Sequence, residues 1–174
     1  PYYYVKMLYD GLKEAGETDI ISLTRAAYPG SQKYGAAVWN GDIVSDWRAL
    51  RQSVTSGLSM AMCGIPWWNS DIGGFLHGDT ENEEFRELMV RWFQFGLFSP
   101  IMRLHGSRIR TKNQPEPNPG IIERSGGPNE IWCFGEENYI TIKKLIETRE
   151  KLKPYTIKYM DLASATGAPV MRPM

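Results

Sequence analysis

The stretch IPWWNSD, residues 65–71, decides the fold because it reads as a short buried strand that ends at one polar side chain, Asp71. A strand of a parallel sheet is buried on both faces, so its sequence is a nearly continuous apolar run. The pair Gly73-Gly74 follows, and glycine allows the backbone to turn tightly after the strand. The stretch therefore predicts a parallel strand with Asp71 at its carboxyl end.

The same pattern, an apolar run that ends at one polar side chain, occurs three more times in the chain. The runs and the residues that follow them are IISLT (20–24) before Arg25, AAVWNG (36–41) before Asp42 and IMRL (101–104) before His105. In an α/β barrel, the groups that do chemistry lie where the parallel strands end. We therefore expect an α/β fold of about four βα units from a (β/α)8 barrel, with the four polar side chains around one pocket.

Amphipathic helical patterns separate and follow the predicted strands. Ser45 and Thr80 are the expected N-caps of two of these helices. The last helix is expected over roughly residues 136–159, with a bend at Pro154. The Pro- and Gly-rich loop over residues 106–135 is too long for a plain connector, so we expect it to cover a site or to hold an inserted turn.

About four βα units provide only half of the eight strands that a closed barrel needs. Half a barrel leaves two unpaired strand edges, which proteins normally cover. We therefore expect the chain to be a piece of a larger protein, cut at both ends. A small open α/β sheet that folds alone remains the alternative.

The composition of the 174 residues limits the partners. Lys and Arg total 20, as do Asp and Glu, so no global field favours nucleic acid or an anionic membrane. The apolar runs are far shorter than the ~20 residues needed to cross a bilayer. Cys63 and Cys133 lack the spacing of a disulfide framework or a metal site, and we expect buried free thiols. Free thiols favour a reducing, cytoplasmic compartment.

Aromatic residues accompany the two aspartates in the sequence. The aromatic residues are Trp39 before Asp42, Trp67 and Trp68 before Asp71, and Phe75 after Asp71. Carboxylates accept hydrogen bonds from sugar hydroxyls, and aromatic rings pack against the C–H faces of a sugar. Carbohydrate is therefore the ligand class that fits these residues best.

Purely structural explanations compete with this interpretation. Asp42 and Asp71 could each accept hydrogen bonds from the amides of the turn that follows them, and His105 could be a satisfied core histidine. The tryptophans could equally belong to the core, which is the better interpretation for Trp47 and Trp92 at their helical spacing. With only two histidines in the chain, we expect no His-based metal cluster.

Four motifs carry a resemblance to a known family. They are WNGD (39–42), GIPWWNSDIGGF (64–75), RWFQFGLFSP (91–100) and RLHG (103–106). In their order and spacing they closely resemble glycoside hydrolase family 31, which contains the α-glucosidases and α-xylosidases. The resemblance extends to GAPVMRP (167–173) and so covers the whole chain. It implies barrel strands five to eight in residues 1–168, with residues 169–174 as the start of the following β-domain.

The resemblance also implies a role for each strand-end residue. Asp42 would be the general acid/base. Arg25 would hold the catalytic carboxylates and the sugar hydroxyls in register. The other residues implied to bind the sugar ring or to shape its subsite are Trp39, Asp71, Phe75 and His105. The family nucleophile, an aspartate at the end of the fourth barrel strand, lies outside this chain.

The implied activity follows from these roles. A retaining glycosidase needs two carboxyl groups about 5–5.5 Å apart, one to attack the anomeric carbon and one to protonate the departing oxygen. The resemblance therefore implies a parent enzyme that needs no cofactor and releases terminal α-linked glucose or xylose from oligosaccharides. This chain alone, without the rest of the barrel and the flanking β-domains, is expected to be inactive. The alternative is a non-catalytic carbohydrate-binding or structural α/β domain.

Overall fold

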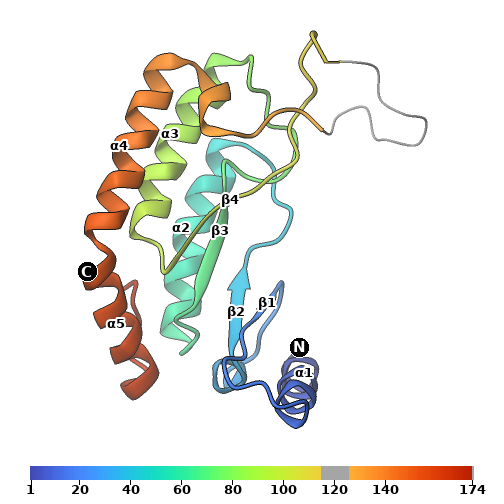
Figure 1. The fold of residues 1–174 in the computed structure, drawn as a ribbon, viewed down its shortest axis with the longest axis vertical. Helices are drawn as coiled ribbons and strands as arrows, with labels where there is room; N and C mark the ends of the chain where they lie inside the picture. Colours follow the sequence, from blue (N-terminus) through green and yellow to red (C-terminus); the bar gives the residue numbers. More distant parts are fainter. Residues whose placement is uncertain (115–125, 174) are drawn as a thin grey trace, which may run out of the picture.

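The computed structural model describes residues 1–114 and 126–173. Within these residues, four strands form one parallel sheet in the order β1-β2-β3-β4 (Figure 1). The strands are β1 (Ser22–Thr24), β2 (Ala36–Trp39), β3 (Trp68–Ile72) and β4 (Ile101–Leu104). Each strand pairs with the next strand along the chain, so the four carboxyl ends lie at one edge of the sheet. This arrangement confirms the predicted succession of βα units.

Helices connect the strands and follow the last one. They are α1 (Tyr2–Glu14), η1 (Ser31–Tyr34), α2 (Trp47–Met62), α3 (Glu83–Phe98), η2 (Ile131–Phe134), α4 (Glu136–Lys151) and α5 (Lys153–Thr166). Helices α2 and α3 pack on the sheet, α4 lies along α3, and α1 lies beside η1 (Figure 1). Within the described ranges, no helix combines the length and the apolar character needed to span a membrane.

The core lies between the sheet and helices α2 and α3. Side chains alternate along a strand, so one set of β3 residues, Trp68, Ser70 and Ile72, faces these helices. A Cβ added at Gly57 of α2 would lie 2.7 Å from Cδ1 of Trp68, and one at Gly96 of α3 would lie 2.8 Å from Cδ1 of Ile72. Glycine at these two positions therefore allows both helices to approach the sheet closely. The other β3 residues, Asn69 and Asp71, point to the opposite face.

Both predicted helix caps are wrong. Helix α2 begins after Asp46 and α3 begins after Asn82, and each cap side chain accepts a hydrogen bond from a first-turn amide, at 2.6 and 2.9 Å respectively. Oγ of Ser45 instead lies 3.4 Å from Nη1 of Arg108, and the amide of Ser45 donates to the carbonyl of Leu76 at 2.9 Å. Thr80 is buried, at 2% exposure, two residues before the true cap. The loops after β2 and β3 are therefore longer than the sequence suggested.

The predicted last helix is two helices. Helix α4 ends at Lys151 and α5 begins at Lys153, with Leu152 between them. Pro154 lies in the first turn of α5, where a proline without an amide hydrogen is tolerated. The proline therefore marks a helix start and not a bend. Residues 167–173 are irregular.

Two predictions about burial are corrected and one is confirmed. Trp92 is fully buried, as expected, and its Nε1 donates to Oγ of Ser70 at 3.0 Å. Trp47 is 41% exposed, because it lies in the first turn of α2 with its Nε1 directed to Glu84. Cys63 is exposed and not buried, although it is a free thiol as predicted.

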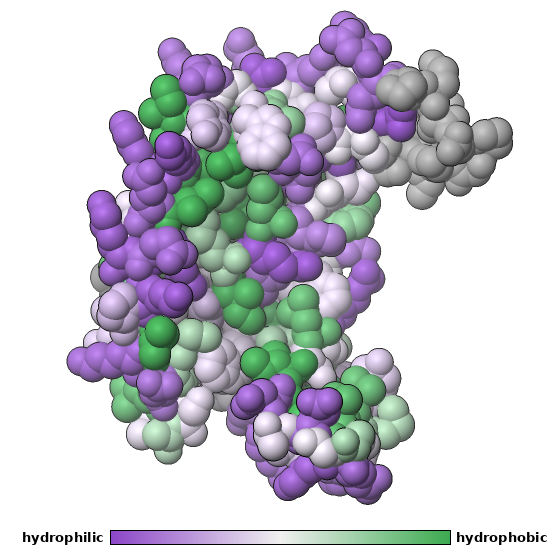
Figure 2. Space-filling model, in the orientation of Figure 1, coloured by the Kyte–Doolittle hydropathy of each residue, from purple (hydrophilic) through white to green (hydrophobic). Residues whose placement is uncertain are grey.

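Apolar side chains are exposed along strand β1. Ile21, which precedes β1, is 78% exposed, and Leu23 within it is 43% exposed. Hydrophobic atoms reach the surface in several patches on the face shown in Figure 2. Among the described strands, β1 pairs only with β2. Its free edge is therefore a surface on which a further strand can pair.

Candidate functional site

The strand ends bring the predicted residues to one edge of the sheet. Arg25 directly follows β1, and His105 directly follows β4. Asp42 lies three residues beyond Trp39, the last residue of β2. The prediction that Asp71 ends its strand is corrected, because Asp71 lies inside β3, opposite Arg103 of β4 in the strand register.

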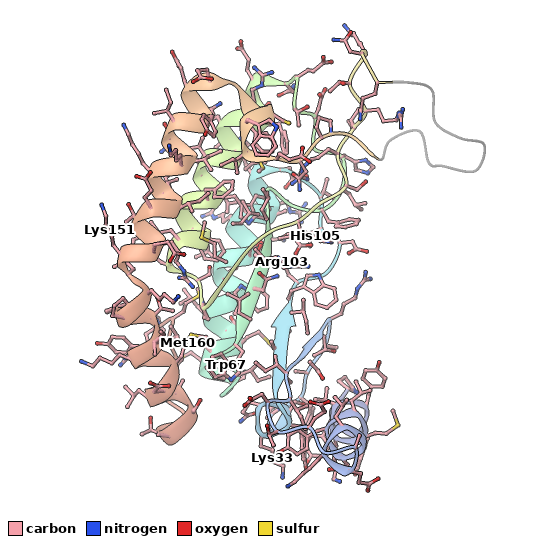
Figure 3. The ribbon with its side chains drawn as sticks, in the orientation of Figure 1. Lys33, Trp67, Arg103, His105, Lys151 and Met160 are labelled. Atoms are coloured by element: carbon pink, nitrogen blue, oxygen red, sulfur yellow. The ribbon has the colours of Figure 1, made fainter. Side chains whose placement is uncertain are left out.

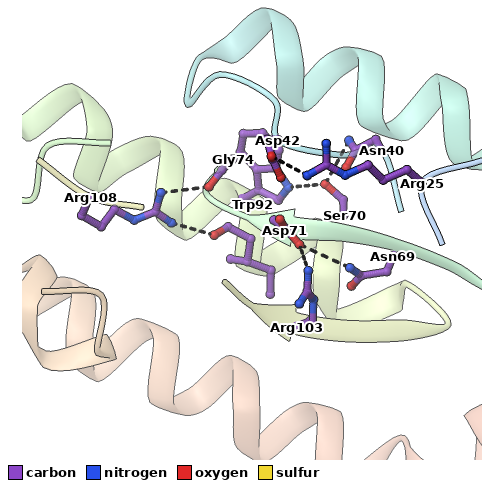
Figure 4. Close-up of polar contacts among 11 residues, drawn as sticks. Arg25, Asn40, Asp42, Asn69, Ser70, Asp71, Gly74, Trp92, Arg103 and Arg108 are labelled. Carbon is purple, nitrogen blue, oxygen red and sulfur yellow. Dashed lines mark hydrogen bonds and ion pairs between the residues drawn. The ribbon is translucent and has the colours of Figure 1, made fainter. Parts of the chain in front are cut away.

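Asp42 forms an ion pair with Arg25. The carboxylate Oδ2 and the guanidinium Nη2 are 2.5 Å apart, and the side chains are 35% and 61% exposed (Figure 4). The Arg25 guanidinium also lies over the Trp39 ring, 5.4 Å from its centroid. Gly41, with a φ of +77°, allows the turn that separates β2 from Asp42. The Asp42 carboxyl is therefore open to solvent and oriented by a cation.

Asp71 forms a second ion pair, in a buried setting. Its Oδ1 is 2.5 Å from Nη2 of Arg103, and the aspartate side chain is fully buried while Arg103 is 30% exposed (Figure 4). Nδ2 of Asn69 donates to the same oxygen at 3.4 Å. Burial raises the pKa of Asp71, although Arg103 and His105 act in the opposite direction. Its Oδ2 is buried and accepts no hydrogen bond from the part of the chain that is described.

His105 packs against Phe75 at the same edge. The two ring centroids are 5.4 Å apart and the ring planes are inclined by 40°. His105 is exposed and Phe75 is half-buried, so the alternative of a core histidine is wrong. The amide of Phe75 donates to the carbonyl of Ile43 at 2.8 Å, which joins the loop after β3 to the loop after β2.

The turn-capping alternative for the two aspartates is also wrong. The amide of Gly74 donates to the backbone carbonyl of Asp71 at 2.9 Å, and the amide of Ser45 donates to that of Leu76 at 2.9 Å. The carboxylates of Asp42 and Asp71 pair with arginines instead. Backbone hydrogen bonds therefore form these turns, and the carboxylates are free for another role.

The tryptophans divide between the site and the core. Trp39 contacts Arg25 at the carboxyl end of β2. Trp68 is the first residue of β3, is 3% exposed and belongs to a core cluster with Val38 and Ile65. Trp67 precedes it, at the end of β3 remote from His105 (Figure 3). The expectation that Trp67 and Trp68 accompany the aspartates is therefore wrong.

Arg103 is a site residue that the sequence interpretation did not single out. A charged residue inside the apolar run IMRL, two residues before His105, was the available signal. Residues two apart on a strand share a face, so Arg103 points to the same side as the site. Among the described residues, no three His, Cys, Asp or Glu side chains cluster as metal ligands would.

The arrangement suits a neutral polyhydroxylated ligand. Asp71 offers a free buried acceptor, the two guanidinium groups offer donors, and the rings of Trp39 and Phe75 offer flat apolar surfaces. Asp42 offers a solvent-accessible carboxyl that can exchange a proton.

The comparisons with known proteins all point to one family. A family model described as the glycosyl hydrolases family 31 TIM-barrel domain matches residues 1–159. The chain is 34% identical, over its whole length, to an α-xylosidase of Saccharolobus solfataricus, of which it covers 21%. It is 35% identical, over 99% of its length, to a probable glucan 1,3-α-glucosidase of Arabidopsis thaliana, of which it covers 17%.

A solved structure agrees with this match. The structure is that of a family 31 α-xylosidase from a soil metagenome, in complex with xylose. It shares 49% identity with the chain and superposes with a TM-score of 0.86. The alignment covers 98% of this chain and 25% of that protein. The chain thus spans about a quarter of that structure and about a fifth of the curated relatives.

Proposed function

The chain belongs to glycoside hydrolase family 31, and we propose that the protein carrying it is a retaining exo-acting α-glycosidase. It removes terminal α-linked glucose or xylose from oligosaccharides. Residues 1–168 form barrel strands five to eight of its catalytic domain, and residues 169–174 begin the following β-domain. The rest of the barrel and the flanking β-domains complete the protein, and the nucleophilic aspartate comes from the fourth strand.

Asp42 is the general acid/base in this proposal. Its protonated carboxyl gives the proton to the glycosidic oxygen while the bond from that oxygen to the anomeric carbon breaks and the nucleophile attacks the same carbon. Asp42, now ionised, then removes a proton from the water that attacks the glycosyl-enzyme ester. Its 35% exposure supports this exchange with water, and Arg25 at 2.5 Å keeps the carboxyl oriented.

The remaining strand-end residues bind the sugar ring. Oδ2 of Asp71, which has no hydrogen-bond partner in the described chain, accepts a hydrogen bond from a ring hydroxyl. His105 binds the ring from the end of β4. Arg25 contacts both the hydroxyls and the acid/base, while Trp39 and Phe75 form the apolar walls. Each residue lies at the carboxyl edge of the sheet, where barrel enzymes place their chemistry.

One observation carries the proposal. The family model covers residues 1–159, and the carboxyl edge of that same segment carries two carboxylates that make no turn and are held by arginines. A structural domain has no need for such a pattern, since its turns are already formed by backbone hydrogen bonds. Relatives named as xylosidases and glucosidases support both sugars as candidates.

The test compares hydrolysis of aryl α-xyloside and aryl α-glucoside by the full-length protein and by its Asp42→Asn variant. Loss of the acid/base slows hydrolysis by roughly 10²–10⁴-fold. An activated phenol leaves without an acid, so added azide should restore turnover of such a substrate by attacking the glycosyl-enzyme ester directly. The glycosyl azide formed should have the α configuration, because the mechanism retains configuration.

Asp46→Asn is the matched control. Asp46 lies four residues after Asp42, but its side chain caps α2, and asparagine is an equally good cap. We expect its activity to equal that of the parent protein. Full activity in Asp42→Asn would remove Asp42 from the acid/base role, and inactivity of the parent on both glycosides would refute the proposed function.

A further inference from the structure

We propose that Arg108 is a positioning residue, which holds the loops after β2, β3 and β4 together so that Asp71, Phe75 and His105 can bind one sugar ring. The inference deepens the proposed function and rests on it. Arg108 lies three residues beyond His105, in the loop after β4. Its side chain is fully buried, which is unusual for a charged residue.

The guanidinium of Arg108 binds the backbone on either side of the β3 turn. Nη1 donates to the carbonyl of Gly74 at 2.8 Å, and Nη2 donates to that of Ile72 at 3.1 Å (Figure 4). Ile72 directly follows Asp71, and Gly74 directly precedes Phe75. One side chain therefore fixes the backbone between Asp71 of β3 and Phe75 of the loop that follows it.

The remaining side-chain contacts of Arg108 reach the loop after β2 and a later part of its own loop after β4. Nη1 lies 3.4 Å from Oγ of Ser45 in the loop after β2, and Nε donates to Oδ1 of Asn129 at 2.7 Å. The neighbouring amide of Ser107 donates to the carbonyl of Phe75 at 2.8 Å. The Arg108 side chain thus joins the loops after β2, β3 and β4. These loops are far apart in the sequence, and the site residues lie in or next to them.

The glycines around Arg108 show that the loops are shaped to admit its side chain. A Cβ added at Gly106 would lie 2.5 Å from Nη1, and one at Gly73 would lie 2.8 Å from Nη2. A Cβ at Gly78 would lie 2.9 Å from Cδ. Real Cβ atoms do not approach other atoms so closely. Gly106 directly follows His105, so the guanidinium packs against the residue next to that site residue.

The charge of Arg108 distinguishes it from an ordinary packing residue. Its hydrogen-bond partners in the described chain are carbonyls, an amide, a hydroxyl and a thioether, none of which is a carboxylate. The Phe85 ring lies 5.1 Å from its Cζ. Burial lowers its pKa to about 10, so the group remains a cation at neutral pH. The nearby charge of Asp71 opposes the effect of burial on this pKa, although no carboxylate of the described chain contacts the guanidinium. A buried cation without a direct carboxylate partner is costly, so its place beneath the site favours a functional role.

The test measures steady-state kinetics of Arg108→Met and Arg108→Lys in the full-length protein. Hydrogen bonds to the sugar ring at the subsite of cleavage strengthen in the transition state, so displacement of the groups that make them lowers kcat as well as raising KM. For Arg108→Met we expect KM, and Ki for the monosaccharide product, to rise about tenfold, with a fall in kcat of up to about a hundredfold. Lysine keeps the charge and part of the hydrogen bonding, so Arg108→Lys should recover most of the loss. A merely structural role would reduce the amount of folded enzyme and its unfolding temperature without changing KM or Ki.

Arg91→Met is the matched control, because Arg91 is exposed on α3 and, among the described residues, pairs only with the α3 side chains of Glu87 and Gln94. Its KM and Ki should equal those of the parent. A folded Arg108→Met variant with unchanged KM and Ki would overturn the proposal, as would Arg108→Lys that performs no better.

If Arg108→Met does not fold, Asn129→Ala decides the matter, because it removes the partner of Nε and leaves Arg108 in place. A rise in Ki in Asn129→Ala supports the proposal, and an unchanged Ki overturns it. Asp42→Asn is measured in parallel. Activity that depends on Asp42 but not on Arg108 defeats this inference alone, whereas a parent inactive on both glycosides defeats the proposed function and this inference with it.

Discussion

Replacement of Arg103 by methionine should cost far more stability than the same replacement of Arg25, although both arginines contact an aspartate at the same distance. Each ion pair has a separation of 2.5 Å. The Arg25 side chain is 61% exposed and its partner Asp42 is 35% exposed. Arg103 is 30% exposed, and its partner Asp71 is fully buried. The two replacements therefore differ in the solvent available to the carboxylate that remains.

The expected magnitudes follow from this difference. An exposed ion pair contributes about 0–1 kcal/mol, so Arg25→Met should change the free energy of unfolding by less than about 1 kcal/mol. Removal of one partner from a buried pair costs roughly 3–5 kcal/mol, because it leaves an uncompensated charge. Arg103 is partly exposed, so we expect a cost near the lower limit, about 3 kcal/mol.

The cost of Arg103→Met should depend on pH. The pKa of Asp71 is already raised by burial, and Arg103 is the main influence that lowers it. Without Arg103 the native protein holds the Asp71 proton more tightly than the unfolded chain does. Its stability then rises as the pH falls through the raised pKa of Asp71. The deficit of Arg103→Met should therefore be largest near neutral pH and should shrink in acid.

The assay is thermal and urea unfolding of the full-length protein and the two variants at about pH 7.5 and about pH 4.5. The stability deficit of Arg103→Met should be larger at the higher of these two pH values. Asp71→Asn and the double variant Arg103→Met/Asp71→Asn complete a double-mutant cycle. In the Asp71→Asn background Arg103→Met leaves no buried charge, so its cost should nearly vanish. An Arg103→Met cost no larger than that of Arg25→Met at neutral pH would refute the reasoning, as would a cost independent of pH.

The remaining predictions concern helix positions away from the site. Gly57→Ala should destabilise the protein by about 1–3 kcal/mol, because the new Cβ lies 2.7 Å from the Trp68 ring; an unchanged unfolding temperature would contradict this packing. Gly11→Ala in α1 meets no atom within 4 Å and should stabilise by about 0.5–1 kcal/mol, measured by the same unfolding assay. Asp46→Ala should cost about 1 kcal/mol through loss of the α2 cap without a change in KM, and altered sugar binding would show that the cap also shapes the site.

The sequence predicted the strands because their physical signal is local. Continuous apolar runs marked all four strands, and the polar residue at the end of each run identified Arg25, Asp42, Asp71 and His105. The structure brings these residues to one edge, since parallel strands joined in sequence order share a direction. The ion pair of Arg25 with Asp42 agrees with the role that the resemblance implied for Arg25. The ion pair of Arg103 with Asp71 could not be predicted, because it depends on register. Arg103 meets Asp71 only because those two residues lie opposite each other across β3 and β4.

The predictions of the helix starts were wrong for a related reason. Ser45 and Asp46 are both good caps, and the choice between them depends on a contact between distant loops. Arg108 of the loop after β4 contacts Oγ of Ser45, the amide of Ser45 donates to the carbonyl of Leu76, and Asp46 caps the helix. Similarly, Arg108 carries no local signal in the sequence. Its importance comes from the carbonyls that the folded loops direct toward it.

The tight approach between Gly106 and Arg108 couples substitutions at these two positions. The three atoms nearest to a Cβ at Gly106 all belong to the Arg108 guanidinium. A side chain at position 106 therefore has to displace this guanidinium while residue 108 is arginine, and it meets no such obstacle once residue 108 is smaller. The effect of a substitution at one position thus depends on the residue at the other.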